Sequence, residues 1–493
     1  MAALTPSSEV CSELLKLYFG QVIAQTRKAL ATLIQYNFVK FEMSERSNNI
    51  AEYSAIAHHI YSLVRYPKYL YLMKVKYGDQ AEILLEVLLN QGQDNASHVI
   101  FQAANRLREA ESGESLDPAP LYEMFTNLAA NQFIIRCTDV TETSSSTHRI
   151  PKLAQVEEKD EFSVPQLNIG PLAQKLKDKA TELGSYSDSN IIWRVNFDRF
   201  EIEMRNVLLV NAAARRVDAV AGELFHLMLE MWNECSRFGA PVTNSIDLNQ
   251  IRDKIRKKTD AAAALREHLD NYLRVLEEDE SGLLTKSGDA GGGQYVLNYR
   301  LVFEKMACAT LDSIVLQKFG PKALRLFKVT REEKHIEHDH MHSLSTILPK
   351  EVKMLSYQLL EHNFLQMQEL KKGTSTSAPI KSFILFHVDV MQVVRMVLRF
   401  SYQGLFNLLV RKDHIAVENK RLFEKHERME SLLATLQGAP EEEIAFVEDS
   451  ATPAEKFLIA KVQAFSDLLT IGSVQVDETI LILEAYIQYV DAK

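Results

Sequence analysis

One short pattern recurs along this chain and restricts its fold more than any other feature. A helical apolar segment ends, a small polar gap follows, and an apolar run typical of a strand begins. The pattern occupies residues 33–39, 128–134 and 359–365, with a looser copy at 276–284. Each close copy contains an asparagine in the gap, at Asn37, Asn131 and Asn363. Since Asn tolerates the left-handed backbone that ends many helices, we expect a helix end and a turn at each one.

A hairpin pattern follows three of these helices. The first reads FVKFEMS, ERSNN, IAEYSAI; the third reads LLTKSG, DAGGG, QYVLN; and the fourth reads FLQMQE, KKGTSTSAP, IKSFILFHV. Two β-type runs around a polar or glycine-rich turn form a hairpin. A helix followed by such a wing, repeated along the chain, predicts winged-helix modules built on a helix-turn-helix core. The second copy has only a weak wing.

Helical segments of the expected number precede most of the wings. The second module has a pair at 95–108 and 118–130. In the third, Pro241-Val242-Thr243 opens a helix that runs through 246 and 251, and a second helix occupies 261–278. In the fourth, Pro349 opens the helix at a first-turn position. The first module has room for only two helices before its wing, about 8–24 and 25–36. A complete module needs a third helix, so we expect this module to be incomplete.

The remaining segments predict a linker and a helical hairpin. Residues 138–190 are rich in Ser, Thr, Asp and Glu, which favours a mobile linker. Residues 388–437 read as one long helix that ends at Gly438-Ala439-Pro440, and Thr452 to Glu455 is a capping box that starts a return segment. A last apolar helix occupies 473–490. A long helix with a return helix predicts an antiparallel coiled-coil hairpin.

Taken together, these patterns predict a mainly α protein with small β wings, in which tandem winged-helix domains precede the coiled-coil hairpin. The expected divisions are an incomplete winged helix 1 at 1–64, winged helix 2 at 65–137, the linker at 138–190, winged helix 3 at 191–300, winged helix 4 at 301–388 and the hairpin at 389–493.

Charge limits how such a chain meets nucleic acid. It carries 56 Lys and Arg against 66 Asp and Glu, a formal charge of −10. Contact with DNA or RNA must therefore use local basic patches, the alternative for each patch being an ordinary solvated surface. Three kinds of cation are candidate contacts with the DNA backbone: those interleaved with tyrosines, those between two module helices, and one at a wing turn. They are Arg65, Lys68, Lys74, Arg252, Lys254, Arg256, Lys257, Lys258 and Lys286, with a further patch at Lys318, Lys322, Arg325, Lys328 and Arg331.

Catalytic and cofactor signatures are lacking. The glycine run 288–293 precedes a strand-like segment rather than a helix, so we interpret it as a wing turn and not a phosphate cradle. The histidines at 335, 338, 340 and 342 match no zinc spacing, and we expect a solvated turn between helices. Hence we predict no catalytic, cofactor-binding or metal residues.

Targeting signals are equally scarce. The four cysteines are scattered singly, which fits a reducing compartment. The most apolar stretch, 383–410, contains His387, Asp389, Arg395 and Arg399, so we interpret it as a buried helix and expect no membrane role.

Five sequence blocks resemble a known family. They are RYPKYLY (65–71), IIWRVNFDRF (191–200), KSGDAGGGQYVLN (286–298), ENKRLFEK (418–425) and VDETILILEAYI (476–487). These blocks look like the large winged-helix subunit specific to DNA-directed RNA polymerase III, which is similar to the alpha subunit of the general factor TFIIE. The blocks stand in order and span the chain from residue 65 to its C-terminal part.

The resemblance implies a function as well as a fold. It implies a non-catalytic nuclear subunit in a three-subunit subcomplex on the polymerase clamp, which binds promoter-bound initiation factor, helps to open DNA and supports initiation at genes for small untranslated RNAs. The family has additional sequence between the counterparts of Val22 and Gln25, and its loss here would break the first module. A winged-helix scaffold of a regulatory-particle or translation-factor assembly remains the alternative, although such chains usually stack helical repeats before one terminal winged helix.

Overall fold

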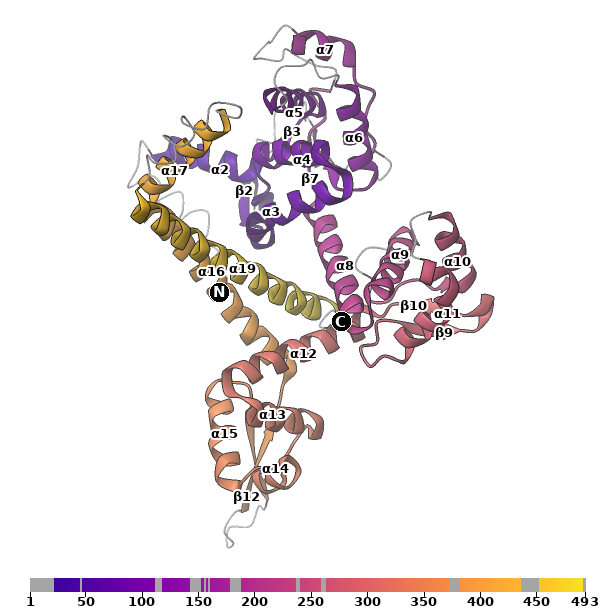
Figure 1. The fold of residues 1–493 in the computed structure, drawn as a ribbon, viewed down its shortest axis with the longest axis vertical. Helices are drawn as coiled ribbons and strands as arrows, with labels where there is room; N and C mark the ends of the chain where they lie inside the picture. Colours follow the sequence, from indigo (N-terminus) through magenta and orange to yellow (C-terminus); the bar gives the residue numbers. More distant parts are fainter. Residues whose placement is uncertain are drawn as a thin grey trace. The chain divides into compact units, whose positions relative to one another are not determined.

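The computed structural model describes residues 22–44, 47–110, 118–141, 152–154, 157, 160–177, 188–235, 240–258, 263–372, 381–435 and 452–490. The chain divides into two compact units, Met1–Met204 and Arg205–Lys493, which we describe separately. Helices dominate both units, and the strands gather in small antiparallel sheets (Figure 1). The predicted fold class, mainly α with small β wings, is confirmed.

Unit 1 contains helices, short strands and one long hairpin. Its elements are α2 (Val22–Gln35), β1 (Val39–Ser44), β2 (Ser47–Ala55), α3 (Ala57–Tyr77), α4 (Asp79–Gln91), β3 (Gln93–Asp94), α5 (Ala96–Ala110), α6 (Ala119–Ala130), β4 (Ile134–Arg136), β5 (Asp139–Thr141), β6 (Lys152–Ala154), α7 (Ile169–Lys177) and β7 (Trp193–Val195). Helix α8 (Phe197–Arg216) begins in this unit and ends in the next.

Unit 2 contains two modules and a helical hairpin. Its elements are α9 (Ala219–Cys235), β8 (Ile246–Asp247), α10 (Leu248–Lys257), α11 (Ala263–Glu278), β9 (Thr285–Gly288), the short 3-10 helix η1 (Ala290–Gly292), β10 (Gln294–Val296), α12 (Tyr299–Phe319), α13 (Pro321–Glu333), α14 (His338–Ser345), α15 (Pro349–Glu361), β11 (Gln366–Lys372), β12 (Lys381–His387), α16 (Val390–Glu418), α17 (Lys420–Thr435) and α19 (Pro453–Val490).

Three helix ends share one backbone geometry, which explains the repeated sequence pattern. The residue before the phenylalanine has a positive φ at Asn37 (57°), Gln132 (67°) and Asn363 (60°). The phenylalanine then donates its N–H to the carbonyl five residues earlier, at 2.9 to 3.0 Å, as in a Schellman motif. The prediction of a left-handed Asn is confirmed at Asn37 and Asn363. It is wrong at Asn131, because Gln132 takes that conformation.

The complete modules share the strand order of a winged helix. The second module has sheet order β3-β7-β4 and the third has β8-β10-β9, so in both the last strand lies between the first two. In the fourth module β11 pairs with β12, and the remaining strand is a single bridge between Ile336 and Phe386. The glycine run indeed forms the turn between β9 and β10, as predicted.

The predicted linker is part of the second module. Strands β4 and β7 pair antiparallel, with Ile134 opposite Val195 and Arg136 opposite Trp193, so residues 137–192 lie between two wing strands. Accordingly, the expected boundaries at 137/138 and 190/191 were wrong. Only three residues of β7 carry the pairing, and a local composition signal cannot reveal a partner this far away along the chain.

Described parts of this insertion pack on the helices of the module. Leu172 and Leu176 of α7 are buried, and Arg108 of α5 donates to the Leu176 carbonyl at 2.9 Å. Buried Asp188 accepts hydrogen bonds from the Ser97 N–H (2.9 Å) and hydroxyl (2.8 Å) at the start of α5. These contacts show that an expectation of mobility was wrong for 160–177 and 188–190; the rest of the predicted linker lies largely outside the described residues.

The first module contains one helix and a hairpin among its described residues. Helix α2 leads into β1 and β2, which pair from Val39 opposite Ala55 to Ser44 opposite Ser47. The side chains of α2 from Gln25 onward are exposed or half-buried, and Phe38 is buried at the following turn. The incomplete module stays a prediction, because the predicted helix at 8–24 lies mostly outside the described residues.

Helices α16 and α19 form the antiparallel hairpin and lie side by side (Figure 1). Lys412 of α16 lies 3.0 Å from Thr470 of α19, and Lys425 of the following α17 lies 2.8 Å from Glu455 near the start of α19, so the two arms run in opposite directions. The predicted single helix 388–437 is interrupted at Asn419, where α17 begins. Conversely, the apolar segment 473–490 is the end of the uninterrupted helix α19.

The capping box at the start of α19 is confirmed. Glu455 donates its N–H to the Thr452 hydroxyl at 3.3 Å, and the Glu455 carboxylate accepts the Thr452 N–H at 3.0 Å. Hydrogen bonds from Lys425 and Thr452 lower the pKa of Glu455 to about 2.

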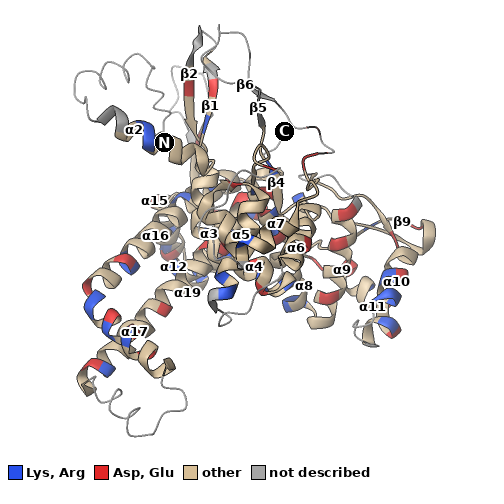
Figure 2. Cartoon of the chain, turned by 90° about the horizontal axis from the view of Figure 1, so that it is seen from above, with Lys and Arg blue, Asp and Glu red and all other residues tan. Residues whose placement is uncertain are grey.

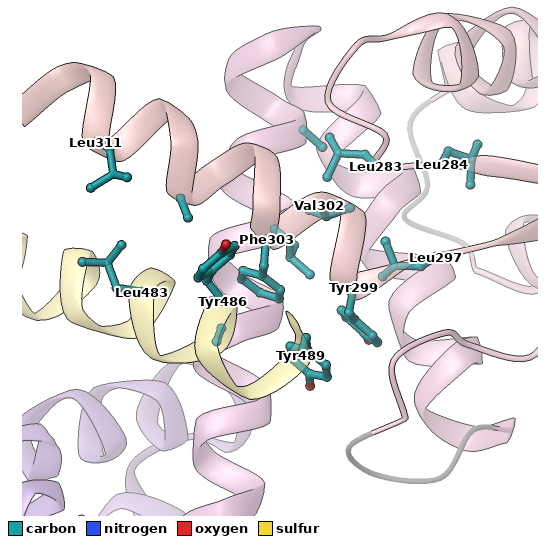
Figure 3. Close-up of a cluster of buried hydrophobic side chains, with 14 of the residues drawn as sticks. Leu283, Leu284, Leu297, Tyr299, Val302, Phe303, Leu311, Leu483, Tyr486 and Tyr489 are labelled. Carbon is teal, nitrogen blue, oxygen red and sulfur yellow. The ribbon is translucent and has the colours of Figure 1, made fainter. Parts of the chain in front are cut away.

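A continuous apolar core joins the end of the hairpin to the modules of unit 2. Tyr299 and Phe303 of α12 stack with Tyr489 of α19, at ring-centroid distances of 5.2 and 5.6 Å (Figure 3). Buried Arg205 donates hydrogen bonds to the hydroxyls of Tyr489 (2.5 Å) and Tyr299 (3.0 Å). These phenol oxygens and the face of the Tyr299 ring stabilise the positive charge of the guanidinium. Aromatic packing of this kind anchors the last turn of α19.

The apolar stretch 383–410 is not one buried helix. It contains part of β12 and the start of α16, and Phe383 and Phe400 are exposed. Among the described helices, α19 alone is long and apolar enough to cross a bilayer by length and composition, with a mean hydropathy of 1.4 in its best window. Helices of soluble proteins pass the same test, and α19 pairs with α16.

Candidate nucleic-acid and subunit interfaces

The structure removes Arg65 from the candidate DNA contacts. This side chain is 0% exposed, its guanidinium lies 4.6 Å from the Tyr61 ring, and it donates to Glu201 at 3.0 Å. An arginine in that position stabilises the packing of α3 and cannot reach a phosphate. Sequence could not show this, because burial depends on which face of α3 packs against the rest of unit 1.

The other cations of α3 interact within the chain. Lys74 lies 3.2 Å from Asp79 and 2.9 Å from Glu82, and hydrogen bonds to these carboxylates raise its pKa. Lys76 pairs with Glu203 at 2.8 Å. Burial opposes the ionisation of Glu203, but the nearby cations outweigh it and its pKa is lowered. Lys68 is half-buried. The α3 patch therefore offers little net charge to a ligand.

Helix α10 presents the strongest basic face. Leu248, Ile251 and Ile255 are buried at helical spacing, which directs the intervening cations outward. Figure 2 shows Lys and Arg gathered on α10 beside α11. Asp247 caps the helix together with Gln250.

Ion pairs within the third module divide this basic face. Arg252 makes two 2.9 Å contacts with Asp270, and Lys254 lies 2.9 Å from Glu234. Arg256 has only a long contact with a neighbouring carboxylate, at 3.8 Å. Lys257 and Lys258 are exposed and have no ion pair with any described residue. The available positive charge therefore lies at the C-terminal end of α10, where the helix dipole also favours cations.

Lys286 is neutralised in place. It pairs with Asp289 at the turn of the wing at 2.5 Å, and that hydrogen bond raises its pKa. Likewise, the patch near α13 consists largely of internal pairs: Lys322 with Glu351 (2.8 Å), and Lys328 (3.4 Å) and Arg331 (2.8 Å) with Asp312.

In the second and third modules, the helices that read the major groove in DNA-binding winged helices are poor in positive charge. Helix α6 contains no Lys or Arg, and α11 carries two arginines against four carboxylates. A helix inserted into a groove needs donors for bases and phosphates. The geometry therefore supports contact along the edge of α10 rather than insertion of α6 or α11.

The histidine-rich segment is the helix α14 and not the predicted solvated turn. The His338 ring packs 4.5 Å from Phe386, and burial, together with Lys353, lowers the pKa of His338. His342 contacts the Ile347 carbonyl at 2.6 Å. Among the described residues, no group of three or more His, Cys, Asp or Glu side chains could hold a metal ion.

Sequence reasoning missed an apolar outer surface on the hairpin. Large apolar side chains are exposed on α19 at Phe457, Phe465, Leu468 and Ile471, away from the face that packs on α16. Further exposed residues on α16 are Phe400, Phe406, Val410 and Val417. Apolar residues on two opposite faces of one helix are the signal that could have revealed it, because one face suffices for a hairpin.

Comparisons with known proteins follow the same modules. A family model described as RNA polymerase III subunit RPC82 matches residues 123–306, and one described as the C-terminal winged-helix domain of POLR3C matches 311–388. DNA-directed RNA polymerase III subunit RPC3 of Homo sapiens is 33% identical over 491 positions, covering 95% of this chain and 91% of that protein. The Rattus norvegicus subunit is 32% identical over 528 positions, covering 97% and 98%.

Proposed function

The chain belongs to the RPC3 family of DNA-directed RNA polymerase III subunits, and from that premise we propose that it is a non-catalytic subunit that supports promoter recruitment, DNA opening and initiation. The observation that carries the proposal is the match of 33% identity across 95% of the chain. Winged-helix modules with a basic edge at the C-terminal end of α10 are consistent with it. A nuclear location follows from the same premise.

The absence of a catalytic role is part of the proposal. His98 contacts Asp94 through Nδ1, as a catalytic base contacts its orienting group, but its Nε2 faces the Gln102 amide at 3.1 Å. A nucleophilic hydroxyl or thiol would be needed there. Nucleotide addition would then be carried out by other polymerase subunits.

Contact with DNA is proposed for Arg256, Lys257 and Lys258. Their side chains are exposed, and a cluster of cations without fixed hydrogen-bond geometry binds phosphates irrespective of sequence. The acidic total charge confines such contact to a local edge. The remaining candidates, apart from buried Arg65, would contribute less because carboxylates of the chain already bind most of them.

Subunit contact is proposed for the outer surface of the α16–α19 hairpin. Exposed Phe457, Leu468 and Ile471 would be covered by another RNA polymerase III subunit, since large apolar side chains exposed along one helix face are typical of an interface. In the arrangement that the resemblance implies, this chain joins two other subunits on the clamp and binds promoter-bound initiation factor.

Purification of the polymerase tests membership first. A tagged chain expressed in its own cells should co-purify with the catalytic RNA polymerase III subunits. Recovery with regulatory-particle or translation-factor subunits instead would overturn the proposal.

Charge removal on α10 tests the DNA contact separately. Arg256→Gln, Lys257→Gln and Lys258→Gln together should reduce promoter opening in a permanganate footprint while the polymerase still assembles. The matched control, Lys257→Arg with Lys258→Arg, keeps the charge and should open DNA normally. Equal footprints for both variants would exclude this edge.

A further inference from the structure

The fourth module has an exposed face between α15 and the wing that none of the contacts above explains. Met354 (62% exposed) and Tyr357 (50% exposed) lie on the outer side of α15. The Tyr357 ring is 6.4 Å from the ring of Phe386, whose neighbour across the wing is Met367, and Ile384 lies two residues along the same strand. Met367 and Ile384 are exposed as well. We call these four residues, together with Lys350 and Lys353, the α15–wing face. Exposed Glu369 stands opposite Ile384, at the end of the face away from the start of α15.

Two lysines place positive charge at one end of this face. Lys350 and Lys353 are exposed in the first half of α15, and neither forms an ion pair with a described residue. Their position is unfavourable within the chain, because the N-terminal end of a helix dipole disfavours cations. An acidic group from outside the chain would relieve that repulsion.

The aliphatic part of the face argues against nucleic acid. Bases stack on aromatic rings, and beside Tyr357 the exposed side chains of the face are Met354, Met367 and Ile384, which are not aromatic. Exposed Glu361, at the far end of α15, would repel a phosphate backbone. Methionine side chains adapt their shape and are common on surfaces that accept apolar protein segments.

We propose that the α15–wing face binds an amphipathic protein segment whose apolar side chains cover Met354 and Tyr357 and whose acidic end meets Lys350 and Lys353. From Lys350 to Glu361 the helix is about 16 Å long, so a partner helix of about three turns matches it. This inference is separate from the membership in the polymerase and from the α10 edge.

Synthetic peptides provide the test with the full-length chain. The probe is a 15-residue helical peptide with leucines at i, i+4, i+7 and i+11 and three glutamates at one end. Two twins carry glutamine or lysine in place of the glutamates. Fluorescence anisotropy should rank the glutamate peptide first and the lysine peptide last, with the glutamate peptide about 3- to 10-fold tighter than the glutamine peptide.

Variants assign the binding to this face. Lys350→Glu with Lys353→Glu should reverse the ranking, so that the lysine peptide binds best. Met354→Gln should weaken all three peptides, and its exposure leaves the core unchanged. Lys305→Glu, an exposed lysine on α12, is the matched control and should change nothing.

The opposing outcomes are equally definite. No measurable binding, equal binding of all three peptides, or an unchanged ranking in the double lysine variant would overturn the proposal. Tighter binding of a single-stranded oligo(dT) probe that depends on Lys350 and Lys353 would assign the face to nucleic acid instead.

Discussion

The first and fourth modules begin their wings with the same motif but bury it differently. Leu33 and Leu359 hold equivalent positions in the repeat, yet Leu33 is 41% exposed and Leu359 is 0% exposed. In the fourth module α13, α14 and the strand at Ile336 cover α15, whereas the described part of the first module has α2 and a hairpin. The comparison shows that the helix–turn–strand motif forms from local contacts, while a buried core requires the other helices of the module.

The comparison with the rat relative is consistent with a missing segment. That alignment spans 528 positions, more than the 493 residues of this chain, so the rat protein carries residues that this chain lacks. The proposed position of the loss, after Val22, remains a prediction.

Leucine truncation should separate the two modules most clearly. Leu359→Ala removes a fully buried side chain and should cost about 2–5 kcal/mol, whereas Leu33→Ala should cost less than about 1 kcal/mol because its site is exposed. Hydrogen exchange of α15 and α2 amides in the full chain measures both. Similar losses at the two sites would mean that α2 is as well packed as α15.

Lengthening the first module should make the local stability of α2 more like that of α15. Insertion of the rat segment after Val22 should bury the apolar side of α2 and raise the protection of its amides by about 1–3 kcal/mol. The control is a glycine–serine insert of equal length, which should add nothing. If α2 in the natural chain already exchanges as slowly as α15, the idea of a broken module is wrong.

The shared turn should respond alike in both modules. Asn37→Ala and Asn363→Ala each place alanine, which tolerates the left-handed conformation less well than asparagine, at a positive φ. Each substitution should lower the free energy of unfolding by about 1 kcal/mol. Gln132→Gly, at the same position of the second module, should instead stabilise by about 0.5–1 kcal/mol. Thermal unfolding checks the three, and a destabilised Gln132→Gly would contradict the assigned geometry.

Acid should loosen the fourth module at α14, and this effect should be the smallest of the four. Burial and Lys353 lower the pKa of His338, while Asp339 opposes the shift, so the unfolded chain binds this proton more readily than the fold. Stability is therefore present above the ordinary histidine pKa of about 6.5 and falls as the pH drops below it. Amide exchange of α14 at pH 7.5 and pH 5 should show the loss, and His338→Phe should abolish it.

Local features of the fold were predictable. Pro349, the Thr452 capping box and the glycine run each act within a few residues, and each formed the predicted helix start or turn. The placement of the α10 cations was wrong: we expected them between two helices, whereas most of them lie on α10 itself, which begins at Leu248 directly after β8. Strand pairing was harder to predict. The antiparallel pairing of β4 with β7 depends on three residues of β7, which a long insertion separates from β4.

By itself, the sequence determined the repeated helix–turn–wing pattern, because hydrogen bonds and backbone preferences near each turn are local; the incomplete first copy stays a prediction. Only the tertiary structure decided that Arg65 is buried beside Glu201, that β7 pairs with β4 across the predicted linker, and that Lys257 and Lys258 form no ion pair with a described residue. Those outcomes depend on contacts between segments distant in sequence, so no local sequence pattern predicts which side chains are buried or ion-paired.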